Sequence, residues 1–209
     1  MVRMFGGSRC LALFAAALVA ACATPAPTIN RYDFGAPAGQ ATNAALADAD
    51  TPDVVVLAPV WLDNPSVLYR LGYADASQLH AYAQTQWVSA PTRLLEQALM
   101  LAGAGNAPRA CGEALAAAGR LEVNLQEFSQ NFDSPQSSHV VLRARARLLA
   151  AHTHALLAQH QFDLRAPAAT PDGPGAVHGL GTLAHDFAAA AFAWAASCPP
   201  EVSGAVPAR

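Results

Sequence analysis

Side chains of the types that a serine hydrolase uses lie close together between positions 133 and 139. They supply one carboxylate, three hydroxyls and one imidazole: Asp133, Ser134, Ser137, Ser138 and His139. A catalytic triad is defined by geometry and not by adjacency in the sequence, however, and the chain contains no G-x-S-x-G motif. Because Pro135 is typical of a turn, we expect a hairpin turn here and predict no catalytic residue.

Two histidines, His152 and His154, have the H-x-H spacing that places both imidazoles on one face of a strand, as a metal site requires. No aspartate or glutamate lies within several residues of them, and Ala150 to Thr153 has the composition of a turn. The sequence also has no C-x-x-C motif and no Cys/His cluster with the spacing of a zinc site. We therefore expect solvated turn histidines and predict neither a metal site nor a cofactor.

Three arginines, Arg143, Arg145 and Arg147, alternate with apolar residues and should therefore lie on one face of a strand. A preceding strand that folds back onto this one would place Glu122 near Arg147 and Gln126 near Arg143. We call the three arginines the arginine stripe. The interpretation that we favour is an exposed sheet face, neutralised by such partners and by solvent.

The alternative interpretation makes the arginine stripe a docking face for an acidic partner or for lipid headgroups. Trp61 would belong to the same candidate docking face, because it lies in a predicted turn and is expected to be exposed. The other aromatic residues are expected in the core and at its rim.

Residues 1–21 have the composition of an export signal. Arg3 and Arg9 precede an uncharged run from Leu11 to Ala21. A membrane-spanning helix needs roughly 20 apolar residues, whereas the apolar region of a signal peptide needs only about 7 to 15. The length of the run therefore indicates a signal peptide.

The end of this segment, Val19-Ala20-Ala21-Cys22, resembles the lipobox of bacterial lipoproteins, in which the cysteine thiol accepts diacylglycerol before cleavage. An ordinary secretory signal that contains a cysteine by chance is the alternative. Lipidation would make Cys22 the first residue of the mature chain and its anchor, with diacylglycerol and an N-acyl chain attached. Because Ala23 and not aspartate follows, we favour the outer membrane, facing the periplasm, over the inner membrane.

Charge and cysteine usage agree with an exported protein. The chain has 12 basic and 15 acidic residues, and such an acidic balance is not expected to bind nucleic acid. Two further cysteines, Cys111 and Cys198, follow the two predicted helices, and an oxidising compartment favours their pairing. If the helices lie side by side, a disulfide forms; two unpaired, half-buried thiols are the alternative.

Apolar periodicity predicts seven strands and two helices. The strands are expected at 29–34, 54–59, 67–73, 79–88, 119–131, 139–150 and 154–165, and the helices at 91–103 and 176–196. Residues 54–59 have no polar interruption, which predicts a central strand covered on both faces. The short strand at 29–34 is expected at an edge.

Short turns join most of these strands, which predicts an α+β fold: one largely antiparallel mixed sheet of about seven strands, with two main helices packed on one face. The chain then divides into four parts. They are the lipoprotein signal peptide 1–21, a flexible tether 22–52 that includes the first strand, an α+β domain 53–200 and a flexible tail 201–209.

Several blocks of the sequence together resemble the ABC-type transport auxiliary lipoprotein family, of which the paraquat-inducible protein C type is best known. The blocks are RYDFG at 31–35, VLAPVWLD at 56–63, LYRL at 68–71, YAQTQW at 82–87, APTRLL at 90–95, LEVNLQEFSQNFDSP at 121–135 and VVLRARA at 140–146. They span nearly the whole mature chain, and the EFSQNFDSP part is the most distinctive.

The resemblance implies a non-catalytic outer-membrane lipoprotein that works with an ABC permease, its ATPase and an MCE-domain protein. Such a system moves phospholipid between the two membranes, and this component would be its outer-membrane docking adaptor. Two other functions stay open: an outer-membrane assembly lipoprotein that binds a β-barrel partner, and a periplasmic hydrolase. The lipid species, the direction of transport and the oligomeric state are not determined by the sequence.

Overall fold

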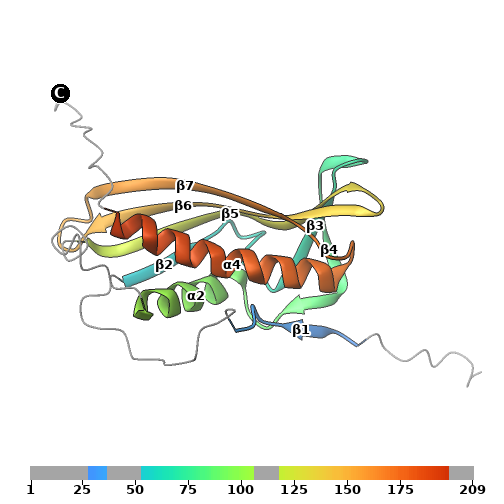
Figure 1. The fold of residues 1–209 in the computed structure, drawn as a ribbon, viewed down its shortest axis with the longest axis horizontal. Helices are drawn as coiled ribbons and strands as arrows, with labels where there is room; N and C mark the ends of the chain where they lie inside the picture. The colour runs from blue at the N-terminus through green and yellow to red at the C-terminus, as the bar shows by residue number, and fades with distance from the viewer. Residues whose placement is uncertain (1–27, 37–52, 106–117, 198–209) are drawn as a thin grey trace, which may run out of the picture.

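The computed structural model describes residues 28–36, 53–105 and 118–197. In chain order the elements are β1 (Asn30–Tyr32), β2 (Asp53–Leu57), β3 (Ser66–Leu71), β4 (Asp75–Trp87), α2 (Pro91–Gly105), β5 (Ala118–Ser134), β6 (Ser137–Ala150), β7 (Leu156–Pro167) and α4 (Gly173–Ala196). Every predicted strand and helix corresponds to one of these elements. The α+β fold is therefore confirmed (Figure 1).

All strands belong to one mixed sheet with the order β1-β4-β3-β5-β6-β7, and β2 pairs with the first half of β5. The pairs β3–β4, β5–β6 and β6–β7 are antiparallel, whereas β1–β4, β2–β5 and β3–β5 are parallel. The antiparallel pairs include the longest strands, so the sheet is largely antiparallel, as predicted. Strand β1 lies at an edge, also as predicted.

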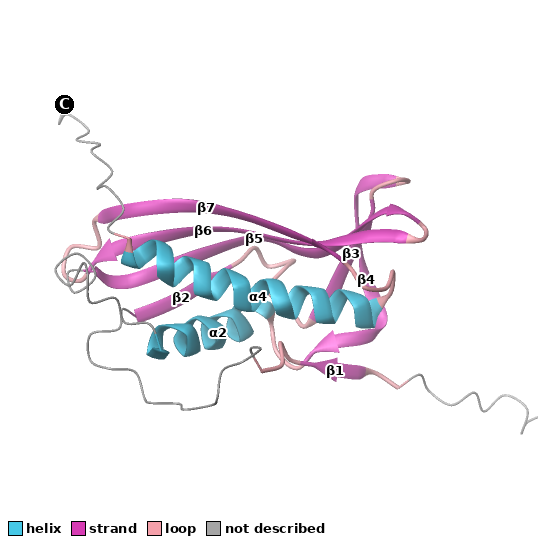
Figure 2. Cartoon of the chain, viewed as in Figure 1, coloured by secondary structure: helices cyan, strands magenta, loops and turns pink. Residues whose placement is uncertain are grey.

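Helices α2 and α4 lie side by side on one face of the sheet (Figure 2). We call this the inner face and the opposite one the outer face. Helix α4 buries residues at helical spacing, among them Leu180, Ala184 and Phe187. Gly179 allows close approach to β6, because a Cβ there would lie only 2.9 Å from a methyl group of Val140. The main hydrophobic core fills the space between the two helices and the inner face.

An aromatic cluster fastens the segment after β1 to this core. The ring of Phe34 lies 5.2 Å from that of Trp87 and 5.6 Å from that of Phe128, measured between centroids. Trp87 and Phe128 are buried, and burying a large apolar side chain contributes about 1.5–3 kcal/mol. The first strand is therefore held firmly to the rest of the domain.

The prediction that β2 is central and covered on both faces is wrong. Within the described ranges β2 pairs with β5 alone. Val54 and Val56 are buried, but Leu57, on the opposite face from them, is 46% exposed. At the other edge of β2, the backbone N–H of Val56 donates a hydrogen bond of 3.1 Å to Oε1 of Glu96 in α2. The apolar run reflects strand propensity, because β-branched residues favour strands whether one face or both are buried.

The β5–β6 pair follows the predicted register only up to a β-bulge. Glu122 lies opposite Arg147, as predicted, but Glu127 and not Gln126 lies opposite Arg143. The register shifts just before Glu127 because a bulge adds one residue to β5. The buried apolar positions of β5 accordingly change from odd to even numbers: Leu121, Val123, Leu125, Phe128 and Phe132. The predicted pairing of Gln126 with Arg143 is therefore wrong, because it assumed an uninterrupted alternation along this strand.

The start of α4 provides a test of local stability. Asp172 Oδ1 accepts hydrogen bonds from the Thr170 hydroxyl, over 2.6 Å, and from the backbone N–H of Gly175, over 2.8 Å. Replacing an N-cap acceptor by alanine typically lowers the free energy of unfolding by about 1 kcal/mol. We expect this loss for Asp172→Ala in urea unfolding at pH 7. Asp172→Asn keeps an acceptor oxygen and should lose less, so equal losses would contradict the capping role.

The same cap makes a contribution that depends on pH. The hydrogen bonds from Thr170 and then Gly175 lower the pKa of Asp172 in the folded protein. The stabilisation should therefore be present above the pKa of the unfolded carboxyl and decrease as the pH falls through the folded pKa. Asp172→Ala should thus differ less from the unsubstituted protein at acidic pH than at pH 7.

Cys111 and Cys198 lie outside the described residues, so the disulfide between them stays a prediction. Helices α2 and α4, which precede the two cysteines in the chain, end at the same end of the domain (Figure 1). We expect thiol titration of the unfolded, non-reduced mature protein to detect neither cysteine. Cys111→Ser should lower stability by on the order of 4 kcal/mol in the chain-entropy model. Two titratable thiols would refute the bridge.

Candidate functional site

The arginine stripe lies on the outer face of the sheet, and two of its three charges are paired. Arg147 contacts Glu122 over 2.8 Å. Arg143 contacts both Glu127 and Asp163, each over 3.2 Å. These carboxylates come from β5 and β7, the strands on either side of β6. The sheet register therefore brings the stripe and its counter-charges together.

Arg145 differs from its two neighbours in the stripe. Its Nε donates a hydrogen bond of 3.4 Å to Oε1 of Gln161, and the side chain is exposed. Asn124 and Gln161 are its partners across the two neighbouring strands. In the part of the chain that the structure describes, no carboxylate lies within 4.0 Å of its guanidinium. The charge of Arg145 is therefore available to a partner.

Further ion pairs extend across the outer face. Arg165 contacts Asp163 over 3.1 Å, and Arg120 contacts Asp53 over 3.0 Å. Hydrogen bonds from Arg165 and, to a smaller extent, from Arg143 lower the pKa of Asp163. Positive and negative side chains alternate closely, so the face carries no strong positive field. The part of the stripe that can recognise an acidic group is Arg145.

The turn between β2 and β3 holds Trp61 at the surface. The backbone N–H of Leu62 donates to the carbonyl oxygen of Pro59 over 2.8 Å, and the side-chain amide of Asn64 donates to the carbonyl oxygen of Trp61 over 2.7 Å. Leu62 is 1% exposed, whereas Val60 is 91% and Trp61 45% exposed. One buried leucine thus secures a turn that presents two apolar side chains to solvent.

The candidate hydrolase residues do not assemble into a triad around Ser138. His139 Nδ1 lies 3.0 Å from Oδ2 of Asp133, a pairing that triads also contain. The hydroxyl of Ser138 is buried, where it accepts a hydrogen bond of 2.8 Å from Nε2 of Gln130. Ser134 and Ser137 are the residues at which β5 ends and β6 begins, so the predicted hairpin turn is confirmed.

His152 and His154 lie in the exposed turn between β6 and β7, as predicted, and His154 has a positive φ of 54°. Among the described residues, no three or more His, Cys, Asp or Glu side chains are grouped so that they could hold a metal ion. None of the helices that the structure describes has the length and apolar character needed to cross a membrane. Cys22, the predicted lipidation site, lies outside the described ranges.

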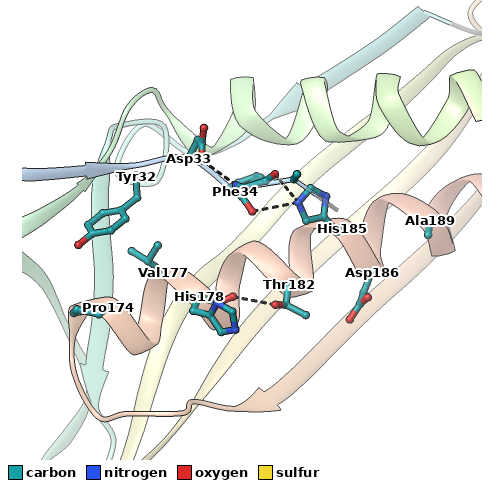
Figure 3. Close-up of a pocket in the computed structure, with 12 residues that line it drawn as sticks. Tyr32, Asp33, Phe34, Pro174, Val177, His178, Thr182, His185, Asp186 and Ala189 are labelled. Atoms are coloured by element: carbon teal, nitrogen blue, oxygen red, sulfur yellow. Dashed lines mark hydrogen bonds between the residues drawn. The ribbon is translucent and has the colours of Figure 1, made fainter. Parts of the chain in front are cut away.

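A cavity of about 650 Å³ lies between the segment after β1 and helix α4 (Figure 3). Nε2 of His185 lies 3.2 Å from the carbonyl oxygen of Phe34 and 3.1 Å from that of Gly35. The hydroxyl of Thr182 donates to the carbonyl oxygen of His178 over 3.0 Å. The His185 contacts hold the segment to the helix, whereas the Thr182 hydrogen bond lies within the helix. The cavity has no assembled catalytic group among the residues that line it.

Two features of the interior were missed by sequence reasoning. One is the His185 contact just described, which joins residues 150 positions apart in the chain. The other is a polar chain in which the Tyr82 hydroxyl donates to Oε1 of Gln130 over 2.6 Å, and Gln130 donates to Ser138 and to the carbonyl oxygen of Thr170. Burial raises the pKa of Tyr82 above its ordinary value. Neither contact follows a sequence period, so only the tertiary fold reveals them.

Comparison with known proteins adds a family and a fold. The family model described as ABC-type transport auxiliary lipoprotein component matches residues 31–191. No curated protein matches the chain. The crystal structure of protein XCC0632 from Xanthomonas campestris, assigned to the family model DUF330, is similar with a TM-score of 0.55 at 15% identity, over 82% of this chain and 94% of that one.

A crystal structure of an uncharacterised protein is similar with a TM-score of 0.57 at 16% identity, and the match covers 78% of this chain and 95% of that one. At such low identities these two structures support the fold alone. The family assignment rests on the match to residues 31–191, which includes every described element except the first residue of β1 and the end of α4. The chain belongs to the family of ABC-type transport auxiliary lipoprotein components.

Proposed function

We propose that this protein is the lipid-anchored, non-catalytic adaptor of an ABC/MCE-type system that moves phospholipid between the inner and outer membranes. Membership of the auxiliary lipoprotein family is the observation that carries the proposal. The MCE-domain partner, the outer-membrane location and the phospholipid cargo come from the resemblance of the sequence blocks described above. The adaptor faces the periplasm and is held by acyl chains on Cys22.

The geometry of the domain agrees with an adaptor. The hydrophobic core leaves a broad, hydrogen-bonded outer face, and within the arginine stripe Arg143 and Arg147 are paired with carboxylates while Arg145 is not. The Asp133–His139 pair lacks an aligned Ser138 hydroxyl, which weakens the hydrolase alternative. A rigid sheet with exposed side chains for docking supports a role in binding a partner.

The anchor can be tested by replacing the proposed lipid acceptor. Cys22→Ala should remove labelling by radioactive palmitate and release or mislocalise a domain that still folds, because none of the described strands and helices includes Cys22. Membrane fractionation and palmitate labelling measure the two effects, with Cys10→Ala as the matched control. Label that persists in the Cys22→Ala protein would refute the anchor.

The transport role can be tested by purifying the lipidated protein from its own cells. Co-purification of an ABC permease, its ATPase and an MCE-domain protein is the expected result. Recovery of a β-barrel protein instead would favour the outer-membrane assembly function. Recovery of neither class, together with hydrolytic activity, would favour the hydrolase and overturn the proposal.

Substitutions in the arginine stripe can test docking to a partner without a large change in the free energy of unfolding. Replacing Arg143, Arg145 and Arg147 together by glutamine should change the free energy of unfolding little, because exposed ion pairs typically contribute under about 1 kcal/mol each. If an acidic partner binds the stripe, co-purification should weaken and lose its dependence on salt. Arg145→Gln alone should reproduce most of this loss, since among the described residues Arg145 has no carboxylate partner. Unchanged co-purification in both variants would exclude the stripe as the docking face.

A further inference from the structure

We propose that the turn between β2 and β3 is a second contact with the phospholipid surface to which Cys22 tethers the protein. We call Leu57, Val60 and Trp61 the apolar tip. The inference rests on the proposed lipid anchor and extends it, because it assigns a membrane contact to the folded domain itself. Four observations support it: the exposure of these side chains, the rigid backbone of the turn, its position near β1 and the charge of Arg145.

The apolar tip exposes three large apolar side chains within five residues. The hydrogen bonds to Pro59 and from Asn64 fix its backbone, and the Thr92 hydroxyl in α2 donates to Asp63 over 2.6 Å. A rigid apolar projection can enter the boundary between lipid headgroups and acyl chains without ordering a flexible loop. Tryptophan favours this boundary because its ring is apolar and its N–H is polar.

The end of the turn that carries the apolar tip lies close to β1, which follows the predicted tether. The backbone N–H of Trp87 donates to the carbonyl oxygen of Pro65, over 2.7 Å, at the end of the turn, and Trp87 also pairs with Tyr32 of β1. Neighbouring strands lie about 4.8 Å apart, so the end of the turn lies about 10 Å from β1. Asn30 comes eight residues after Cys22, which limits its distance from the anchored thiol to about 28 Å.

The positive charge of Arg145, which attracts lipid phosphate, lies on the same outer face as Leu57. Leu57 is opposite Asn124, and Asn124 is opposite Arg145, so the three form a row across the outer face. The guanidinium of Arg145 has no carboxylate partner among the described residues, and a lipid phosphate can bind it through two parallel hydrogen bonds. A phospholipid surface can therefore bury the apolar tip and bind Arg145 through its phosphate groups at the same time.

Fluorescence quenching tests this contact in the complete lipidated protein. The protein is reconstituted into vesicles of phosphatidylethanolamine and phosphatidylglycerol that contain brominated phosphatidylcholine, whose bromine atoms quench tryptophan on contact. Trp87 is 1% exposed and Trp194 packs against His160 and Phe162. We expect quenching that Trp61→Phe removes and that Trp194→Phe, the matched control, leaves in place.

Two further variants test the contributions of the tip and of the charge. Val60→Asp changes an almost fully exposed side chain, so the fold should persist while quenching falls at least about twofold. Arg145→Gln should lower quenching about twofold in vesicles rich in phosphatidylglycerol. Arg165→Gln is its control, because Arg165 already pairs with Asp163, and it should have little effect.

Equal quenching in the Trp61→Phe variant and the unsubstituted protein would overturn the proposal. It would also be overturned if bromine left Trp61 unquenched and added permease or MCE subunits shielded it from acrylamide, since the tip would then bind protein. Neither result affects the transport role, which co-purification tests separately. A protein that carries no acyl chain would instead refute the anchor.

Discussion

Helix α4 packs along the inner face of β5, β6 and β7, and this burial is the interaction on which the rest of the domain depends. Small residues such as Gly179 and Ala184 bring the helix close to the strands, while Phe187 and Leu180 fill the interface. Since each buried large apolar side chain contributes about 1.5–3 kcal/mol, the interface selects which face of β5, β6 and β7 is covered. The opposite face must then be polar.

The outer face is polar because it carries arginines paired with carboxylates, and it therefore has no large excess of positive charge. Arg143 and Arg147 each contact carboxylates from neighbouring strands, which keeps a broad sheet surface hydrated without making it strongly basic. Against such a background, an unpaired arginine and a rigid apolar turn stand out as the places where recognition can occur. The docking and membrane roles proposed here therefore use the exceptions on this face, Arg145 and the apolar tip.

The segment after β1 is held to the folded core by residues far along the chain. Phe34 packs against both Trp87 and Phe128, and His185 contacts the backbone carbonyl oxygens of Phe34 and Gly35. These contacts join the segment to the centre of the domain and not only to an edge strand.

The sequence by itself determined the elements, the α+β class and the alternation that separates Arg143 and Arg147 from the core, because strand and helix periods depend on local backbone geometry. It did not predict the bulge before Phe128, so the expected pairing of Gln126 with Arg143 was wrong. Only the tertiary structure decided that His185 contacts Phe34 and that, within the described ranges, β2 pairs with β5 alone and Arg145 has no carboxylate partner. These features join residues far apart in the chain, and their energies depend on packing that no local pattern encodes.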